Sequence, residues 1–168
     1  MVWVNGPVVV YHGTDEISAR NIQNSGIQLA LCRPAADFGR GFYVTSNLHQ
    51  AEQWANQKMG HLPQGSSARL AAVLTFDLDR DVAANLDDHL TFVIADPAFH
   101  DFVIYNRLGG PYHHRNSGVG YDLVYGPVAS YPQTITYANC DQICFLNQRA
   151  LGGLTIRSGT PAYGNPLF

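Results

Sequence analysis

Lysine is almost missing from this sequence. Lys58 is the single lysine among ten basic residues, so the other nine are arginines. Charge of either sign is sparse, with 14% charged residues and a net charge of −3. Binding to nucleic acid without sequence preference depends on clustered cations, so a global electrostatic footprint for nucleic acid is excluded, whereas a local basic groove is not. The arginines that are present suit bidentate contacts with phosphate or carboxylate groups.

Cysteine is also scarce, and its spacing is loose. The three cysteines are Cys32, Cys140 and Cys144, and an odd number at such spacing indicates neither a disulfide framework nor a zinc knuckle. A reducing compartment fits this pattern best. The adjacent pair His113 and His114 is a weak metal signal, because neighbouring side chains rarely converge on one ion. We therefore expect no metal site.

The chain lacks the short motifs of several large enzyme classes. It has no G-x-S-x-G elbow, no phosphate-binding Walker loop, no H-E-x-x-H helix and no dinucleotide fingerprint of Rossmann type. Residues 1–10 lack a basic start and are interrupted by Asn5, Gly6 and Pro7, so they predict neither a signal peptide nor a membrane span. A cytoplasmic location is expected, although an effector delivered into a target cell would have the same features.

What the sequence does contain is enough apolar material for a real core. With 46% hydrophobic residues in 168, we expect one globular domain over residues 1–168 with an irregular tail at 158–168. Short apolar or alternating runs predict strands at 7–11, 42–45, 70–78, 121–125, 142–146 and 154–156, and a weaker one at 134–137. Capping residues and helical spacing predict helices at 15–24, 47–59, 87–95 and 97–107 and one helical turn at 148–151. The remaining loops are 27–41, 60–69 and 109–120. Strands and helices mixed without a βαβ rhythm indicate the α+β class.

Four stretches, in order along the chain, carry the candidate chemistry. They are Tyr11–Thr14, Asp37–Thr45, Tyr121–Ala129 and Gln142–Phe145. Each alone is a weak signal, and the plain interpretation of Gly39-Arg40-Gly41 is a tight turn before a strand. Together they resemble a bacterial domain family that is catalogued as uncharacterised and is similar to ADP-ribosyltransferases. The resemblance spans about residues 8–156 and includes the run 50–55 behind the second stretch.

The resemblance implies a fold of split antiparallel β-sheets with flanking helices and a cleft that binds NAD as a substrate. The diphtheria-toxin and PARP-like branch carries a His–Tyr–Glu triad, which maps onto His12, Tyr43 and Gln142. His12 would hydrogen-bond a ribose hydroxyl on the adenosine side, and the Gly13 backbone would hold the nicotinamide amide. Tyr43 would stack on the nicotinamide ring. The NAD-contacting set implied in this way is His12, Gly13, Thr14, Arg40, Phe42 and Tyr43.

Glutamine at position 142 departs from the usual glutamate of that triad. Cleaving the bond between nicotinamide and ribose builds positive charge on the ribose, and a glutamine carbonyl can still accept a hydrogen bond from the ribose 2′-hydroxyl. Losing one charge-assisted contact costs on the order of 1.5–3 kcal/mol, or roughly 10- to 100-fold in rate. A guanidinium suits the pyrophosphate, with Arg40 as the first candidate and Arg33 as the second.

The resulting hypothesis is an NAD-dependent mono-ADP-ribosyltransferase that modifies a macromolecule, with a bacterial or phage toxin or effector as its setting. The acceptor, whether protein or nucleic acid, stays open, and an antitoxin or immunity protein is a conceivable partner. No membrane partner is expected. Two alternatives remain: an NAD glycohydrolase that passes ADP-ribose to water, and a non-catalytic NAD-binding module of the same fold. Asp122, flanked by apolar residues, is interpreted as structural.

Overall fold

The computed structural model describes residues 6–111 and 120–168. Within these residues the chain forms two compact units. The first unit combines Met1–Gln28, Val44–Arg80 and Gly153–Phe168, and the second combines Leu29–Tyr43 and Asp81–Gly152. Helices and mostly antiparallel strands occur in both, so the protein is of the α+β class, as the sequence predicts. Among the described residues, no helix has both the length and the apolar character needed to cross a membrane.

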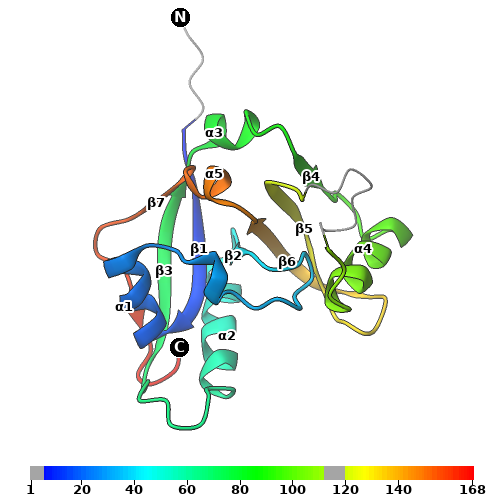
Figure 1. Cartoon of the computed structure of the whole chain (residues 1–168). Helices are drawn as coiled ribbons and strands as arrows, with labels where there is room; N and C mark the ends of the chain where they lie inside the picture. The colour runs from blue at the N-terminus through cyan, green and yellow to red at the C-terminus, as the bar shows by residue number, and fades with distance from the viewer. Residues whose placement is uncertain (1–5, 112–119) are drawn as a thin grey trace, which may run out of the picture. The chain divides into compact units, whose positions relative to one another are not determined.

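An antiparallel sheet forms the centre of the first unit (Figure 1). Its order is β1 (Val8–Asp15), β3 (Ala71–Leu78) and β7 (Leu154–Ile156), and β8 (Ala162–Tyr163) also pairs with β3. β3 follows from the apolar alternation of its sequence, but Val73 is buried as well as Leu74, so the start of this strand is covered on both faces. β8 lies inside the tail expected to be irregular at 158–168. Ala162 and Tyr163 pair with Val73 and Ala72 of β3, and the other residues of the tail lie outside helices and strands.

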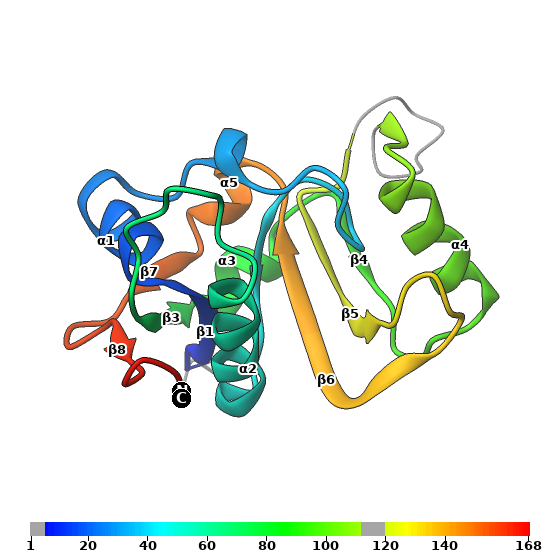
Figure 2. The ribbon, with the colours of Figure 1, turned by 90° about the horizontal axis from the view of Figure 1, so that it is seen from below.

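Two helices complete the first unit, α1 (Glu16–Ser25) and α2 (Leu48–Met59). α2 packs on β1 (Figure 2). Ala51 and Ala55, both buried, lie at the contact. α1 begins at the N-cap Asp15, whose side chain accepts hydrogen bonds from the backbone of Ile17 and Ser18. Small residues on α2 permit a close approach of helix and strand, and the cap fixes where α1 starts.

Asp15 also pairs with the single lysine of the chain. Lys58 Nζ lies 3.0 Å from Asp15 Oδ2 and donates to Thr14 Oγ1 at 2.7 Å and to Ser18 Oγ at 3.1 Å. Burial opposes ionisation of Asp15, but the hydrogen bonds from Ser18 and the nearby ammonium outweigh it and lower the pKa of the carboxyl below its usual value. The end of β1, the start of α1 and the end of α2 are thus joined at one ion pair.

We expect Asp15→Ala to lower the free energy of unfolding by about 2 kcal/mol at pH 7, because it removes a helix cap and leaves Lys58 without its partner. A carboxyl with a lowered folded-state pKa contributes stability above the unfolded pKa of about 3.9, and this contribution is lost as the pH falls through the folded value. The difference in free energy of unfolding between wild type and variant should therefore become smaller as the pH is lowered towards ~3. Urea unfolding at several pH values measures it. Asp101→Asn, an exposed carboxylate on another helix, is the control and should leave stability unchanged.

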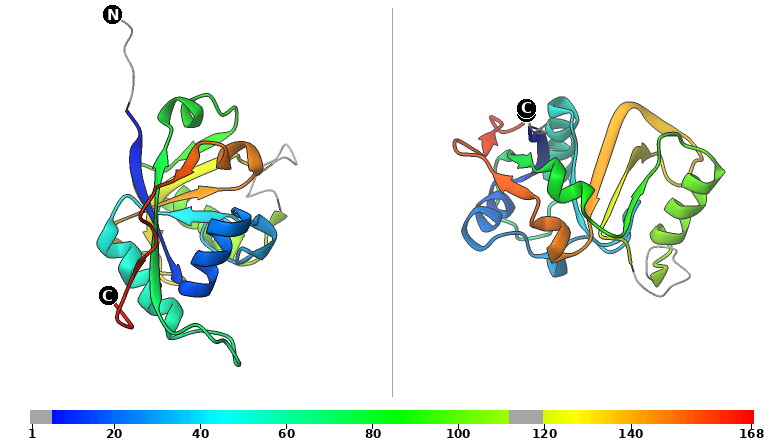
Figure 3. Two further views of the ribbon diagram at one scale, coloured as in Figure 1. Left: turned by 90° about the vertical axis from the view of Figure 1, so that its left-hand side faces the viewer. Right: turned by 90° about the horizontal axis from the view of Figure 1, so that it is seen from above.

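The second unit is built on the sheet β2 (Phe42–Val44), β6 (Thr136–Phe145), β5 (Leu123–Ala129) and β4 (His89–Thr91), in that order. β5 lies between β6 and β4 (Figure 3). α4 (Pro97–Arg107) and α5 (Gln148–Leu151) belong to the same unit, as does the short 3-10 turn η1 (Leu29–Leu31). α3 (Arg80–Ala84), a short helix that the sequence patterns did not predict, follows β3.

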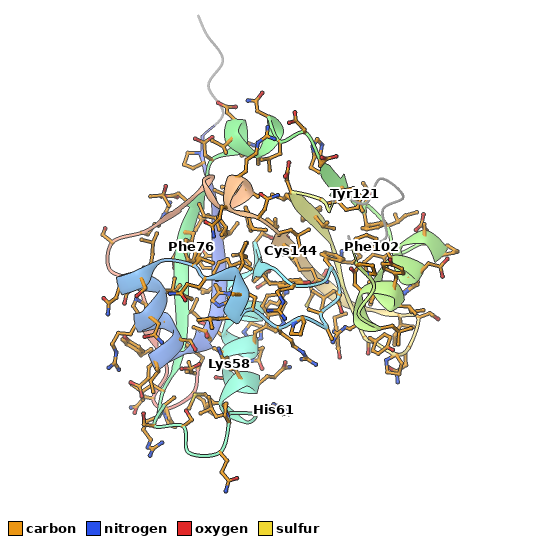
Figure 4. All side chains as sticks on the ribbon, in the orientation of Figure 1. Lys58, His61, Phe76, Phe102, Tyr121 and Cys144 are labelled. Atoms are coloured by element: carbon orange, nitrogen blue, oxygen red, sulfur yellow. The ribbon has the colours of Figure 1, made fainter. Side chains whose placement is uncertain are left out.

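Aromatic rings fill the core of this unit. Phe38, Phe99 and Phe102 are buried together with Cys144, and Phe92 packs against them. Figure 4 labels Phe102 beside Tyr121, whose ring centroids lie 6.0 Å apart. Such edge and offset contacts add to the stability that burial of the rings provides. α4 is therefore held by its own phenylalanines.

The predicted helix at residues 87–95 is wrong, because this segment contains β4. His89, Leu90 and Thr91 pair in parallel with Leu123, Val124 and Tyr125. Two hydrogen bonds between the residues that precede these strands extend the pairing. Asp122 N donates to Asp88 O at 2.7 Å, and Asp88 N donates to Asp122 Oδ2 at 3.3 Å. Tertiary pairing thus overrides local helical propensity, and Asp122 has the structural role expected for it.

Other boundaries also differ from those predicted. The strands expected separately at 134–137 and 142–146 are one long strand, β6, and the strand expected at 121–125 begins later and runs to Ala129 as β5. β1 continues through Gly13 to Asp15 and does not stop at residue 11. Most of the loop expected at 109–120, including His113 and His114, lies outside the described residues.

Candidate functional site

The stretch from Asp37 to Tyr43 folds into a closed turn in the second unit. Gly39 has φ 86°, a conformation that glycine adopts without strain. Gly41 lies against β6, where a Cβ atom would come within 2.3 Å of Cys144 Sγ and 2.8 Å of Phe145 O. Tyr43 closes the turn: its hydroxyl donates to Gly39 O at 2.7 Å and accepts from Phe38 N at 2.9 Å. Gly39 is therefore required by the backbone of the turn, and Gly41 by the packing of the turn against β6.

Tyr43 is held in one orientation by these contacts. Its ring stacks on Phe38, with the centroids 6.3 Å apart and 27° between the planes. Burial and the neighbouring Cys144 thiol raise the pKa of the phenol well above its usual value, so the hydroxyl keeps its proton and its donor role. Burial likewise raises the pKa of the Cys144 thiol. The side chain is half-buried and packs against the aromatic core of the second unit, so its ring is held in one position.

Asp37 is the polar centre of the same turn, and it is 3% exposed. Its Oδ1 accepts from Arg107 Nε at 2.8 Å and Nη2 at 2.6 Å. Its Oδ2 accepts from Ala129 N at 3.0 Å and from Gln142 Nε2 at 2.8 Å. A buried carboxylate is stable only when paired and hydrogen-bonded, and here four donors meet that need. The turn is thereby joined to α4, β5 and β6 through one side chain.

Gln142 lies on β6 and is buried, with 4% of its surface exposed. Its Nε2 donates to Asp37 Oδ2 and, at 3.0 Å, to Pro127 O. Both amide protons are thus engaged by acceptors of the second unit. The side-chain carbonyl oxygen, Oε1, is the remaining polar atom of the residue.

The other candidates of the second unit differ in exposure. Phe42 is buried at 3% exposure, so its ring belongs to the core. Arg40 is exposed, and its Nη1 donates to Ala30 O at 2.8 Å, which anchors one edge of the guanidinium. No carboxylate of residues 6–111 or 120–168 pairs with Arg40. Arg40 therefore has a fixed position and a positive charge that is available to bind an anion, and it stays the first candidate ahead of Arg33.

The first unit contains His12, Gly13 and Thr14, all on β1. His12 is half-buried and pairs with Leu74 of β3. Thr14 is fully buried, and its hydroxyl accepts from Lys58, so this hydroxyl already has a structural role. Gly13 lies against α2, where a Cβ atom would come within 2.0 Å of Ala51 O. The absence of a side chain at Gly13 is thus required by packing.

The N–H and C=O groups of Gly13 face the edge of the sheet that lies away from β3. Tyr11 N donates to Thr45 O at 2.8 Å and Tyr11 O accepts from Thr45 N at 2.9 Å, so the peptide groups of Tyr11 face the edge of β1 away from β3. Peptide groups of alternate residues in a strand face the same side, so those of Gly13 face that edge as well. The partner strand agrees, because Val73 O accepts from Thr160 Oγ1 at 3.3 Å on its other side. The bridge of Tyr11 to Thr45 is an isolated one, and the described residues supply no partner to the N–H or C=O of Gly13.

The candidate residues thus fall into two groups. Arg40, Phe42, Tyr43 and Gln142 belong to the second unit, and His12, Gly13 and Thr14 belong to the first. Asp37 and Arg107 are at the centre of the hydrogen-bond network around Gln142, and neither was among the predicted site residues. They lie far apart in the sequence and neither forms a recognisable motif with Gln142, so no local pattern identifies them.

Comparison with known proteins places the chain in a family. Residues 8–139 match the family described as "Protein of unknown function (DUF3990)", and the chain belongs to it. Sulfate adenylyltransferase subunit 1 of two Yersinia pseudotuberculosis strains, of serotypes O:1b and I, and of Yersinia pestis is 33% identical to this chain over 99 residues. That match covers 57% of this chain and 20% of each relative, so it spans about a fifth of the relatives' length.

Proposed function

We propose that this protein is an NAD-dependent mono-ADP-ribosyltransferase with the split-sheet fold of that class, acting on a macromolecule as a toxin or effector. The observation that carries the proposal is the outward-facing peptide pair of Gly13. A primary carboxamide such as that of nicotinamide donates to a carbonyl and accepts from an N–H, so it pairs with a strand edge as another strand does. Gly13 offers both groups at an edge where regular pairing has ended at Tyr11.

The remaining candidates supply the other functions that the reaction needs. In the proposed step the bond between ribose C1′ and the nicotinamide nitrogen breaks, and nicotinamide leaves with the bonding electrons. The acceptor's nucleophilic atom forms the new bond to C1′ and loses its proton. Tyr43 would stack on the nicotinamide ring, His12 would bind a ribose hydroxyl and Arg40 would contact the pyrophosphate. Preorganised contacts of this kind supply much of an enzyme's rate enhancement.

A second candidate is a module that binds NAD without turning it over. The specific observation in its favour is Gln142, which brings no negative charge to stabilise an oxocarbenium-like ribose and whose amide protons are already engaged. NAD glycohydrolase activity is the intermediate case, in which water is the acceptor. The adenylyl transfer that gives the Yersinia relatives their name is not extended to this chain, because the match covers only a fifth of their length.

Nicotinamide release from NAD by the purified protein, followed by chromatography, and titration calorimetry with NAD test the proposal together. We expect binding in the micromolar range and slow turnover. Arg40→Gln should weaken NAD binding about 10-fold, the loss expected for one charge-assisted contact, and should change turnover at saturation little. The control is Arg149→Gln, because Arg149 is an exposed arginine paired with Asp87, and it should leave both unchanged. Labelled NAD with lysate, digested separately by protease and nuclease, identifies the acceptor class. No binding at ~1 mM NAD contradicts the proposal.

A further inference from the structure

Building on the proposed function, we infer that Asp37 is a positioning residue for Gln142. It turns the amide nitrogen of Gln142 inward and leaves Oε1 to accept a hydrogen bond from the ribose 2′-hydroxyl of NAD. The sequence singles out Gln142 as the position where a glutamate is usual, and the structure places a different carboxylate one hydrogen bond away from it.

The orientation of the Gln142 amide follows from the chemistry of its partners. Asp37 Oδ2, at 2.8 Å, and Pro127 O, at 3.0 Å, both accept hydrogen bonds and donate none. A flipped amide would place its own oxygen against these two acceptors, so Nε2 must face them. In the planar amide, Oε1 then points away from Asp37 and Pro127. The direction of the only acceptor atom in the side chain is fixed by its neighbours.

Asp37 is itself held firmly enough to act as this support. Each of its two oxygens accepts two hydrogen bonds: Oδ1 accepts both from Arg107, and Oδ2 accepts one from Ala129 N and one from Gln142 Nε2. Arg107 also donates to Ala35 O at 3.3 Å and lies over the ring of Tyr131, 5.5 Å from its centroid. Both Arg107 donors meet Oδ1, and the backbone N–H of Ala129 meets Oδ2. Charge-assisted and backbone donors therefore hold both oxygens of the carboxylate in place, and its position sets the direction in which Gln142 is held.

Oε1 is the atom left for a ligand. Among the described residues nothing donates to it, and the buried side-chain atom that lacks a hydrogen-bond partner there is Asn106 Oδ1 and not Gln142 Oε1, so Oε1 reaches the molecular surface. The Asp37 carboxylate at the nitrogen end draws the amide protons towards itself and increases the negative charge on Oε1, because hydrogen bonds in a chain polarise one another. Asp37 and Gln142 together thus provide part of what a single glutamate provides.

A double-mutant cycle tests the coupling. We expect Gln142→Met and Asp37→Asn each to slow nicotinamide release at saturating NAD about 10- to 100-fold, with the Kd for NAD changed less than about 3-fold. The double variant should be no slower than Gln142→Met alone, because Asp37 acts through Gln142. Asp87→Asn, which removes an exposed carboxylate paired with Arg149 in the same unit, should have no effect on either quantity.

The outcomes are distinguishable. If wild type neither binds NAD nor releases nicotinamide, the proposed function fails and this inference fails with it. If wild type is active but the two losses multiply in the double variant, or Asp37→Asn weakens NAD binding as much as it slows turnover, Asp37 has only a general structural role and the inference alone is overturned. Should Asp37→Asn not fold, Arg107→Lys replaces it in the cycle. That variant keeps the charge but cannot reproduce the paired Nε and Nη2 contacts to Asp37 Oδ1, and it should slow release about 3- to 10-fold in the presence of Gln142 and not in its absence.

Discussion

Gly13→Ala is expected to lower the free energy of unfolding by at least about 3 kcal/mol, enough to leave a marginally stable protein largely unfolded. The added Cβ would lie 2.0 Å from Ala51 O and 2.8 Å from Ala55 N. These are backbone atoms of α2 and cannot rotate away as a flexible side chain would, so relief requires the helix to move off β1. Urea unfolding followed by circular dichroism measures the loss.

The matched control is Gly60→Ala, at the end of the same helix. The nearest atom to its added Cβ is Gln57 O at 3.4 Å, an ordinary contact, and its φ of −71° suits alanine. Stability should therefore stay the same or rise by several tenths of a kcal/mol. If Gly13→Ala kept wild-type stability and lost only NAD binding, the glycine would serve the ligand alone and the close packing of α2 on β1 would not be the reason for it.

The elements that were predicted correctly are those with local signals. Asp15, Asn47 and Asp96 each accept from the backbone at the start of a helix, and capping residues of this kind are visible in the sequence. The alternation over 70–78 predicted an antiparallel strand, which β3 is. The turn at 39–41 was predicted from its glycines, and both are needed there. Local chemistry was sufficient in each case.

The features that could not be predicted depend on partners distant in the chain. β4 forms because Asp122 and the start of β5 are available to pair with it, and nothing within residues 87–95 encodes that. Asp37 meets donors from three other segments, at positions 107, 129 and 142. Its sequence context indicated a turn but not an ion pair. Gln142 was predicted as a site residue through a family pattern, which gives no indication of its hydrogen bond to the Asp37 carboxylate.

Gln142→Glu is the second substitution with a large expected effect, and that effect is the opposite of what the family pattern would suggest. Replacing the amide with a carboxyl restores the usual glutamate, yet it places a second acidic group where Nε2 now meets Asp37 Oδ2 at 2.8 Å and Pro127 O at 3.0 Å. Neither neighbour can donate, and two carboxylates so close cannot both ionise without a large penalty. We expect a loss of about 3 kcal/mol in unfolding free energy at pH 7 and slower nicotinamide release than wild type.

The dependence on pH identifies the cause. The introduced carboxyl would have a folded pKa raised above its unfolded value of about 4.3, since its protonated form can donate to Asp37. Below pH ~4 the group is protonated in both states and the variant should approach wild-type stability. As the pH rises from there to the raised folded value, ionisation favours the unfolded chain and the loss grows until it levels off. Gln142→Met, which removes the donor without adding charge, should show a smaller loss that is constant over the same range. A variant with glutamate that is as stable as wild type at pH 7 and faster in nicotinamide release would mean that the contact with Asp37 is dispensable.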